Sequence, residues 1–205
     1  MGRSVENLNL SKKSKANKRS DAGEDYSESS AIHSGDATRI VVLHGEVSEE
    51  SISLVVAQLL VYASQSHKPI SLIISTYGGS VDEMFTLYDT IKFLPCPVHT
   101  IALGKVMSAG VLLLASGVKG KRMIGRNARI MIHPVSGGHQ GNVFEVMNDT
   151  KEHKRLQDQM VSAIVKETKC SRDEIEKIMT AGHDYYLLPE QAIKLGIVDK
   201  IIGEK

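Results

Sequence analysis

The chain has 205 residues, of which 41 % are hydrophobic and 24 % are charged; this composition is typical of a folded globular protein. Lys and Arg number 25 against 24 Asp and Glu, for a formal net charge of +1. The chain therefore lacks the large positive charge that would attract nucleic acids and anionic membranes. Aromatic residues make up only 4 % and Trp is absent, which leaves few side chains for stacking on bases. The numbers therefore disfavour nucleic-acid binding.

The two cysteines, Cys96 and Cys170, are far apart and form no C-x-x-C motif. This spacing argues against a disulfide framework and against a cysteine-ligated zinc site, and it fits a reducing, cytoplasmic compartment. Apolar runs such as Val111 to Ala115 are far shorter than the roughly 18 residues that a membrane span needs. We therefore expect no bilayer-crossing segment.

Residues 1 to 36 differ in composition from the rest of the chain. They are rich in Ser, Lys, Asn, Asp and Glu, and they contain no apolar core of a signal peptide. We expect a mobile tail or a processed leader here, with the lysines near its middle as an alternative contact for an acidic partner. Residues 37 to 205 are expected to form one domain.

Regular hydrophobic periodicity begins at Arg39, where short buried strands start to alternate with amphipathic helices. This alternation predicts an α/β fold with parallel strand pairs. Tyr77-Gly78-Gly79 and Gly104 are interpreted as turns, and a stripe that includes Leu59 and Leu60 is expected to face the core. Strands are expected over 40–43, 70–75, 98–103, 122–124 and 128–132, helices over 48–66, 81–93, 107–116, 142–169 and 173–179, and a closing helix and strand within 192–202.

The expected helix after Gly141 is unusually long for so small a domain. Some 27 residues would reach roughly 40 Å at 1.5 Å per residue, and the middle of the helix is polar all round. Apolar residues, including Phe144 and Met147, flank this polar middle. We expect another subunit to cover the helix, which predicts a homo-oligomer.

Ser108 follows a predicted strand and opens a predicted buried helix. A hydroxyl at this place lies beside unpaired N–H groups that favour negative charge, and the Ala109 N–H is a candidate oxyanion donor. The alternative is an ordinary N-cap serine. The surrounding residues do not form a G-x-S-x-G motif, because position 106 is Val106.

His133 and Asp184 are candidate partners of this serine. His133 ends a predicted strand, and strand ends in α/β folds face the crevice where ligands bind. Alternatively, His133 forms a structural hydrogen bond and Asp184 is a turn or cap residue; His183 is a competing histidine. A serine, a base and an acid together are what acyl transfer requires.

Two further groups bear on this chemistry. Gly78-Gly79 offers a second backbone donor for an oxyanion, since a chain without side chains can approach a carbonyl closely; a plain turn is the alternative. Lys105 offers a Ser–Lys dyad, with a solvated loop lysine as the alternative.

Several motifs in order resemble the Clp protease proteolytic subunit (ClpP family) from about Arg39 to Ile202. The residues that carry the resemblance are the segments 75–80 (S-T-Y-G-G-S), 107–110 (M-S-A-G), 131–134 (M-I-H-P) and 184–199, together with the 25-residue spacing from Ser108 to His133. The resemblance implies Ser108 as nucleophile, His133 as general base and Asp184 as catalytic acid. It also implies Gly78 and Ala109 as oxyanion donors.

The resemblance further implies a crotonase-like fold of repeated β-β-α units, with the long helix as a projecting handle between rings. Two stacked seven-subunit rings would enclose the active sites, and an AAA+ unfoldase would use ATP to feed in substrate. The peptidase itself would need no metal or other cofactor. Gly79, Gly137 and Gly138 would bind substrate, the last two by pairing with it as an added strand.

The chain departs from the family pattern at several positions. Tyr77 stands where the family has proline, Pro134 where it has glutamine, and His183 where it has an arginine that helps rings associate. The stretch before Arg39 lacks the family's usual segment and its axial-loop sequence.

The sequence thus predicts a serine endopeptidase that cleaves unfolded polypeptides to short peptides. Two alternatives remain: a non-catalytic ring subunit that partners an active paralogue, and a crotonase-type acyl-CoA enzyme that shares the fold and the oxyanion turn.

Overall fold

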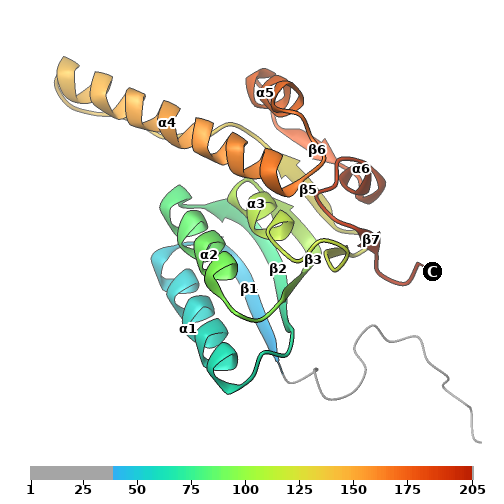
Figure 1. Ribbon diagram of the computed structural model, residues 1–205. Helices are drawn as coiled ribbons and strands as arrows, with labels where there is room; N and C mark the ends of the chain where they lie inside the picture. Colours follow the sequence, from blue (N-terminus) through green and yellow to red (C-terminus); the bar gives the residue numbers. More distant parts are fainter. Residues whose placement is uncertain (1–38, 205) are drawn as a thin grey trace, which may run out of the picture.

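The computed structural model describes residues 39–204, so the segment 1–36 on which a tail or leader was expected lies outside the described residues. The described chain is an α/β fold in which helices pack on a largely parallel sheet (Figure 1). Its elements are β1 (Ile40–Val47), α1 (Glu49–Gln65), β2 (Ile70–Gly79), α2 (Val81–Phe93), β3 (Val98–Met107), α3 (Ala109–Ala115), β4 (Met123–Ile124), β5 (Arg129–Ile132), α4 (Val143–Glu167), α5 (Arg172–Thr180), β6 (Tyr185–Leu187), α6 (Pro189–Lys194) and β7 (Lys200–Ile201).

The sheet follows the order β1-β2-β3-β4-β7, and every pair along this path is parallel. β5 pairs in parallel with the end of β3, and β6 pairs antiparallel with β5. The expected parallel α/β class is therefore confirmed. The short antiparallel strand β6 was not predicted, because three residues are too few to show a period.

Helices α1, α2 and α3 cover one face of this sheet (Figure 1). Along β1 the side chains alternate, with Val41 and Leu43 buried under the helices and Val42 52 % exposed. Leu103 on β3 is also 40 % exposed. Part of the opposite face of the sheet is thus apolar and open to solvent within the described chain.

Helix α1 begins where its capping residue predicts. The Ser48 side chain accepts a hydrogen bond from the Ser51 N–H, and the Ser51 hydroxyl accepts one from the Ser48 N–H, as a capping box. Leu59 is fully buried, but Leu60 is 43 % exposed, so the prediction that it faces the core is wrong. One residue turns a helix by about 100°, which carries Leu60 out of the buried stripe.

Two strands run further than the glycine signals predicted. β2 continues through Gly78 and Gly79, which pair with Glu46 and Val47 of β1, so this glycine pair lies in a strand. β3 likewise continues through Gly104 to Met107. Register shifts in both strand pairs absorb the irregular backbone, as bulges do beside many active sites.

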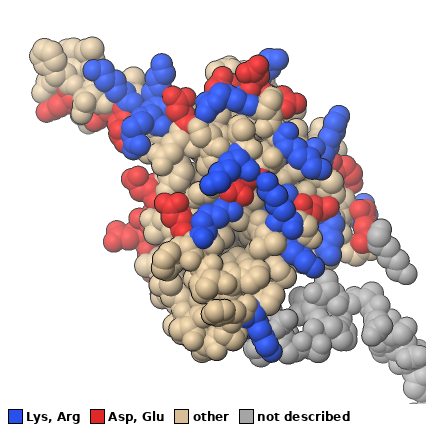
Figure 2. Space-filling view, in the orientation of Figure 1, with Lys and Arg blue, Asp and Glu red and all other residues tan. Residues whose placement is uncertain are grey.

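Helix α4 has 25 residues and is about 37 Å long at 1.5 Å per residue. Its C-terminal part is buried on the body of the domain, whereas its N-terminal part projects away (Figure 1). This geometry confirms the expected projecting helix. In Figure 2 the free end of α4 shows few charges, and there Phe144 is 82 % exposed and Met147 53 % exposed.

Among the described helices, none combines the length and the apolar character that crossing a membrane would require.

Candidate active site

Ser108 lies between β3 and α3 in a strained backbone conformation. Its φ of 53° and ψ of −122° make it the one non-glycine residue with positive φ in the described chain. Such strain persists only where the surroundings impose it. Here the Ser108 N–H donates to the Met131 carbonyl at 2.8 Å, and the Ser108 carbonyl accepts from the Val111 N–H at 2.9 Å.

The side chain of Ser108 contacts the imidazole of His133. Oγ of Ser108 lies 2.7 Å from Nε2 of His133, and it forms no capping bond to α3. Ser108 thus stands at the N-cap position of α3, but its hydroxyl contacts His133 and does not cap the helix. A hydroxyl at this distance from an imidazole nitrogen has the arrangement in which a base takes the proton of a serine nucleophile.

The sheet explains how residues 25 positions apart come together. Met107 of β3 pairs with Met131 of β5, so the two strands end side by side, and Ser108 and His133 follow closely after these ends. The expectation that the chemistry lies at the carboxyl ends of parallel strands agrees with this geometry.

Gly78 packs directly against Ser108. A Cβ placed on Gly78 would lie 2.6 Å from Cβ of Ser108 and 3.1 Å from its Oγ, and the φ of Gly78 is +99°. Only glycine fits this position, for both reasons. The Gly78 N–H donates a hydrogen bond to Oγ1 of Thr76 at 2.9 Å.

The other expected donor, the Ala109 N–H, belongs to the first turn of α3. It makes no hydrogen bond to another residue of the described chain. First-turn amides of a helix have no partner within the helix, so this N–H is available to a ligand.

No hydrogen bond joins Asp184 to His133 in the described chain. The antiparallel register pairs Ile132 with Tyr185, and one further step along it sets His133 opposite Asp184. Yet Asp184 is exposed, and within the described residues its only hydrogen bond comes from the Tyr186 hydroxyl at 3.5 Å. The structure thus brings Ser108 and His133 together. It places Asp184 opposite His133 in the strand register but without a hydrogen bond between the two side chains.

The two competing side chains are engaged elsewhere. Nδ1 of His183 lies 2.9 Å from the carbonyl of Ala181, in its own turn. The Lys105 ammonium lies 4.6 Å from the centre of the Tyr77 ring, as a cation–π contact. No hydrogen bond joins Lys105 to Ser108 in the described chain, so the geometry offers no support for a Ser–Lys dyad.

A small pocket opens beside the Ser108–His133 pair. Val81 and Met160 give it an apolar side, which sequence reasoning missed because these residues come from α2 and α4. Its lining residues are Gly79, Val81, Ser108, Ala109, His133, Pro134, Val135, Ser136 and Met160.

The segment with Gly137 and Gly138 leads from this pocket toward α4. A Cβ on Gly137 would lie 2.3 Å from Cε1 of His153, whereas one on Gly138 would meet nothing within 4 Å. Nδ1 of His153 in turn lies 2.9 Å from Nε2 of His139. A histidine pair therefore holds one side of this glycine segment against α4, and Gly138 stays open.

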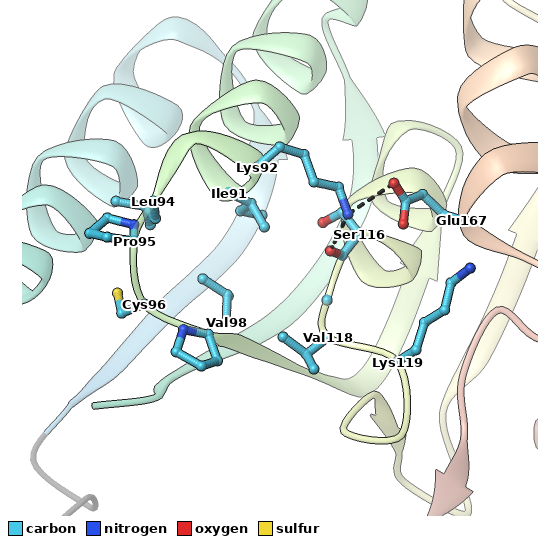
Figure 3. A pocket seen from close by; sticks show the side chains of 12 residues that line it. Ile91, Lys92, Leu94, Pro95, Cys96, Val98, Ser116, Val118, Lys119 and Glu167 are labelled. Carbon is cyan, nitrogen blue, oxygen red and sulfur yellow. Dashed lines mark hydrogen bonds and ion pairs between the residues drawn. The ribbon is translucent and has the colours of Figure 1, made fainter. Parts of the chain in front are cut away.

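A larger pocket lies near the C-terminal end of α2, and no histidine lines it (Figure 3). Lys92 lines this pocket, and its Nζ contacts the Ser116 carbonyl at 2.8 Å and Oε1 of Glu167 at 2.9 Å. The Tyr88 hydroxyl also donates to Glu167 at 2.8 Å, and burial with this carboxylate raises the pKa of Tyr88. These bonds join α2 to α4, so we assign this cluster of polar side chains a structural role.

Within the described residues, no three His, Cys, Asp or Glu side chains are grouped so that they could hold a metal ion. What the described site offers is a hydroxyl, an imidazole and backbone amides. These groups are suited to acyl transfer.

Comparison with known proteins agrees with this geometry. A sequence model of the family described as Clp protease matches residues 25–205. The chain is also 36 % identical over 167 residues to the ATP-dependent Clp protease proteolytic subunit of Deinococcus radiodurans, and the match covers 81 % of each chain. A match of this length and identity, over the segments that build the Ser108 site, shows that the chain belongs to the Clp protease family.

Proposed function

We propose that this protein is a serine endopeptidase, the proteolytic subunit of an ATP-dependent Clp-type protease that hydrolyses unfolded polypeptides to short peptides. The observation that carries the proposal is the 2.7 Å approach of Oγ of Ser108 to Nε2 of His133 at the strained start of α3. Membership of the Clp protease family supports it, as does the similarity to the ATP-dependent Clp protease proteolytic subunit of Deinococcus radiodurans.

In the proposed reaction, Oγ of Ser108 attacks the scissile carbonyl carbon while His133 takes the hydroxyl proton. The carbonyl oxygen becomes an oxyanion, which the N–H groups of Gly78 and Ala109 bind. The tetrahedral intermediate then breaks its C–N bond, and His133 gives its proton to the leaving amine. Water attacks the acyl-enzyme by the same route and releases the second peptide.

Asp184 is proposed to orient His133 and to stabilise the imidazolium that forms. Its position opposite His133 along the β5–β6 register supports this role. Because Asp184 is exposed and bonded only weakly to Tyr186, a small shift of the segment before β6 has to close the contact. We propose that packing against other subunits drives this shift.

Substrate binding is proposed along the glycine segments. Gly79, Gly137 and Gly138 offer backbone that an extended peptide can pair with as an added strand, and Gly138 has open space beside it. The apolar side of the pocket, formed by Val81 and Met160, would take an apolar side chain of the peptide.

The assembly is proposed to be two stacked heptameric rings of this chain. The exposed apolar residues of α4, and the apolar open face of the sheet with Val42 and Leu103, support contacts between subunits. An AAA+ unfoldase is proposed as the partner that uses ATP, so the peptidase itself would need no cofactor. We propose a cytoplasmic location, which the unpaired Cys96 and Cys170 support.

Hydrolysis of a fluorogenic peptide and labelling by a fluorophosphonate test the proposal. Ser108→Ala should abolish both, whereas Ser53→Ala, which changes an exposed serine of α1, should keep both. Peptide turnover that survives in Ser108→Ala would reject the assignment. Failure of the unaltered chain to label would favour a non-catalytic ring subunit, and a thermal shift on adding coenzyme A esters would favour an acyl-CoA enzyme.

A further inference from the structure

Thr76 occupies a fully buried position beside the proposed oxyanion site. Its exposed fraction is 0 %, and its Oγ1 accepts the hydrogen bond of the Gly78 N–H at 2.9 Å. This N–H is one of the two donors proposed for the oxyanion. In the described chain it therefore already has an acceptor.

Packing fixes the orientation of the Thr76 side chain. A Cβ placed on Gly110, in the first turn of α3, would lie 2.5 Å from Cγ2 of Thr76, so the threonine methyl fits closely against this glycine. Rotation about χ1 would move the methyl out of that contact, and β-branched side chains are stiff at χ1 in any case. The hydroxyl is thus held toward Gly78.

An amide N–H has one proton, for which the Thr76 hydroxyl and a substrate oxyanion compete. We propose that Thr76 is a positioning residue whose hydroxyl accepts the Gly78 N–H hydrogen bond in the resting enzyme. The oxyanion then has to displace the threonine hydroxyl from this donor. The inference rests on the proposed function and deepens it. Thr76 acts through Gly78, with no contact to the reacting atoms required of it.

This arrangement predicts opposite effects on rate and stability when the hydroxyl is removed. Thr76→Val keeps the shape and deletes the acceptor, so the buried Gly78 N–H loses its partner in the resting enzyme and the melting temperature falls. The transition state no longer has to break that bond, so kcat for a short fluorogenic peptide should rise about threefold to tenfold, the worth of one net hydrogen bond. KM should stay unchanged, because the oxyanion forms only after binding.

Thr76→Ser is the matched control, since it keeps the hydroxyl and deletes the methyl. It should keep kcat within about twofold of the unaltered enzyme if the hydrogen bond is what holds the donor back. Thr76→Ala repeats the loss of the hydroxyl with less bulk, for the case in which the second methyl of valine prevents folding. Affinity for a peptide boronate, which forms a tetrahedral adduct on the serine, should rise with kcat in the variants that lack the hydroxyl.

A rise of kcat in Thr76→Val or Thr76→Ala, with a lower melting temperature and an unchanged Thr76→Ser, supports the proposal. Slower or unchanged turnover in both variants without the hydroxyl overturns it, and so does equal acceleration in Thr76→Ser. Ser108→Ala in the same assay separates a failure of the proposed function from a failure of the proposed role of Thr76. If it retains turnover the proposed function fails, and if it is inactive while the Thr76 variants are not faster only the role of Thr76 fails.

Discussion

Asp184 immediately precedes Tyr185, the first residue of β6, and lies opposite His133 along the β5–β6 register. The two side chains nevertheless form no hydrogen bond in the described chain. The Ser108–His133 contact, by contrast, is already formed at 2.7 Å. The proposed nucleophile and base follow the ends of β3 and β5, where Val106, Met107 and Ile132 are buried. The proposed acid, Asp184, belongs to an exposed segment, so its alignment is the step that we propose other subunits control.

Asp184→Asn should lower kcat by about 10²- to 10⁴-fold, because an amide does not hold the imidazole in the required tautomer or stabilise its charge. The pair of residues Ser108 and His133 should remain in place, so slow fluorophosphonate labelling should persist. Asp173→Asn, which changes an exposed carboxylate in the first turn of α5, is the control and should keep full activity. Equal peptidase rates in the two variants would remove Asp184 from the mechanism.

Gly78→Ala tests the close approach of β2 to Ser108, the proposed nucleophile. The added methyl would lie 2.6 Å from Cβ of Ser108, so the variant should lose at least about 100-fold in kcat, a loss comparable to that of an oxyanion donor. Gly45→Ala is a closely matched control, because Gly45 has a φ of +97° against +99° for Gly78 but nothing within 4 Å of its Cβ position.

Both glycine variants should melt at lower temperature, since each forces alanine into a conformation that costs about 1–3 kcal/mol. Only Gly78→Ala should lose peptidase activity and labelling. Comparable activity in both variants would show that the space beside Ser108 is not needed for the reaction.

Much of the fold could be predicted from local signals. The capping serine Ser48 and the helix-stopping Pro95 mark helix ends through nearby atoms alone, and α1 and α2 begin and end close to where these signals place them. The strand lengths could not be predicted in the same way. Gly78 and Gly79 look like a turn in sequence, and only pairing with β1 keeps them in a strand.

In the candidate site, too, local signals identify single residues but do not predict the contacts that strand pairing creates. Ser108 and His133 could be named because each follows a predicted strand, but their 2.7 Å contact depends on the pairing of β3 with β5. Thr76 gave no signal, since a threonine in a strand is ordinary. Its importance lies in one hydrogen bond to a residue two positions away and in packing against Gly110 on another element.

Asp199→Asn should destabilise the chain in a pH-dependent manner. Burial disfavours the charged form of Asp199, but hydrogen bonds from Arg122 and from the Gly120 N–H outweigh it and hold the pKa of this carboxyl below its ordinary value of 3.8. A lowered pKa in the folded state contributes stability above the unfolded pKa, and this contribution is lost as the pH falls through the folded pKa.

At pH 7 the variant should therefore unfold about 3 kcal/mol more easily, because Arg122 is buried and loses its charged partner. The gap between the two unfolding free energies should narrow only as the pH falls below about 4, near the ordinary aspartate pKa. Urea unfolding at a series of pH values measures this gap. A gap that stays constant down to pH 3 would mean that the ion pair does not stabilise the fold.

Phe144→Glu tests whether the free end of α4 joins the two proposed rings to each other. Phe144 is 82 % exposed and lies with Val143 and Met147 on a part of the helix that projects from the domain. A charge buried at such a contact is strongly unfavourable, so the variant should sediment at about half the mass of the unaltered assembly, with an unchanged melting profile of the subunit. Phe144→Leu keeps an apolar side chain and should sediment with the unaltered protein, whereas a full-sized assembly of Phe144→Glu would place the ring-to-ring contact elsewhere.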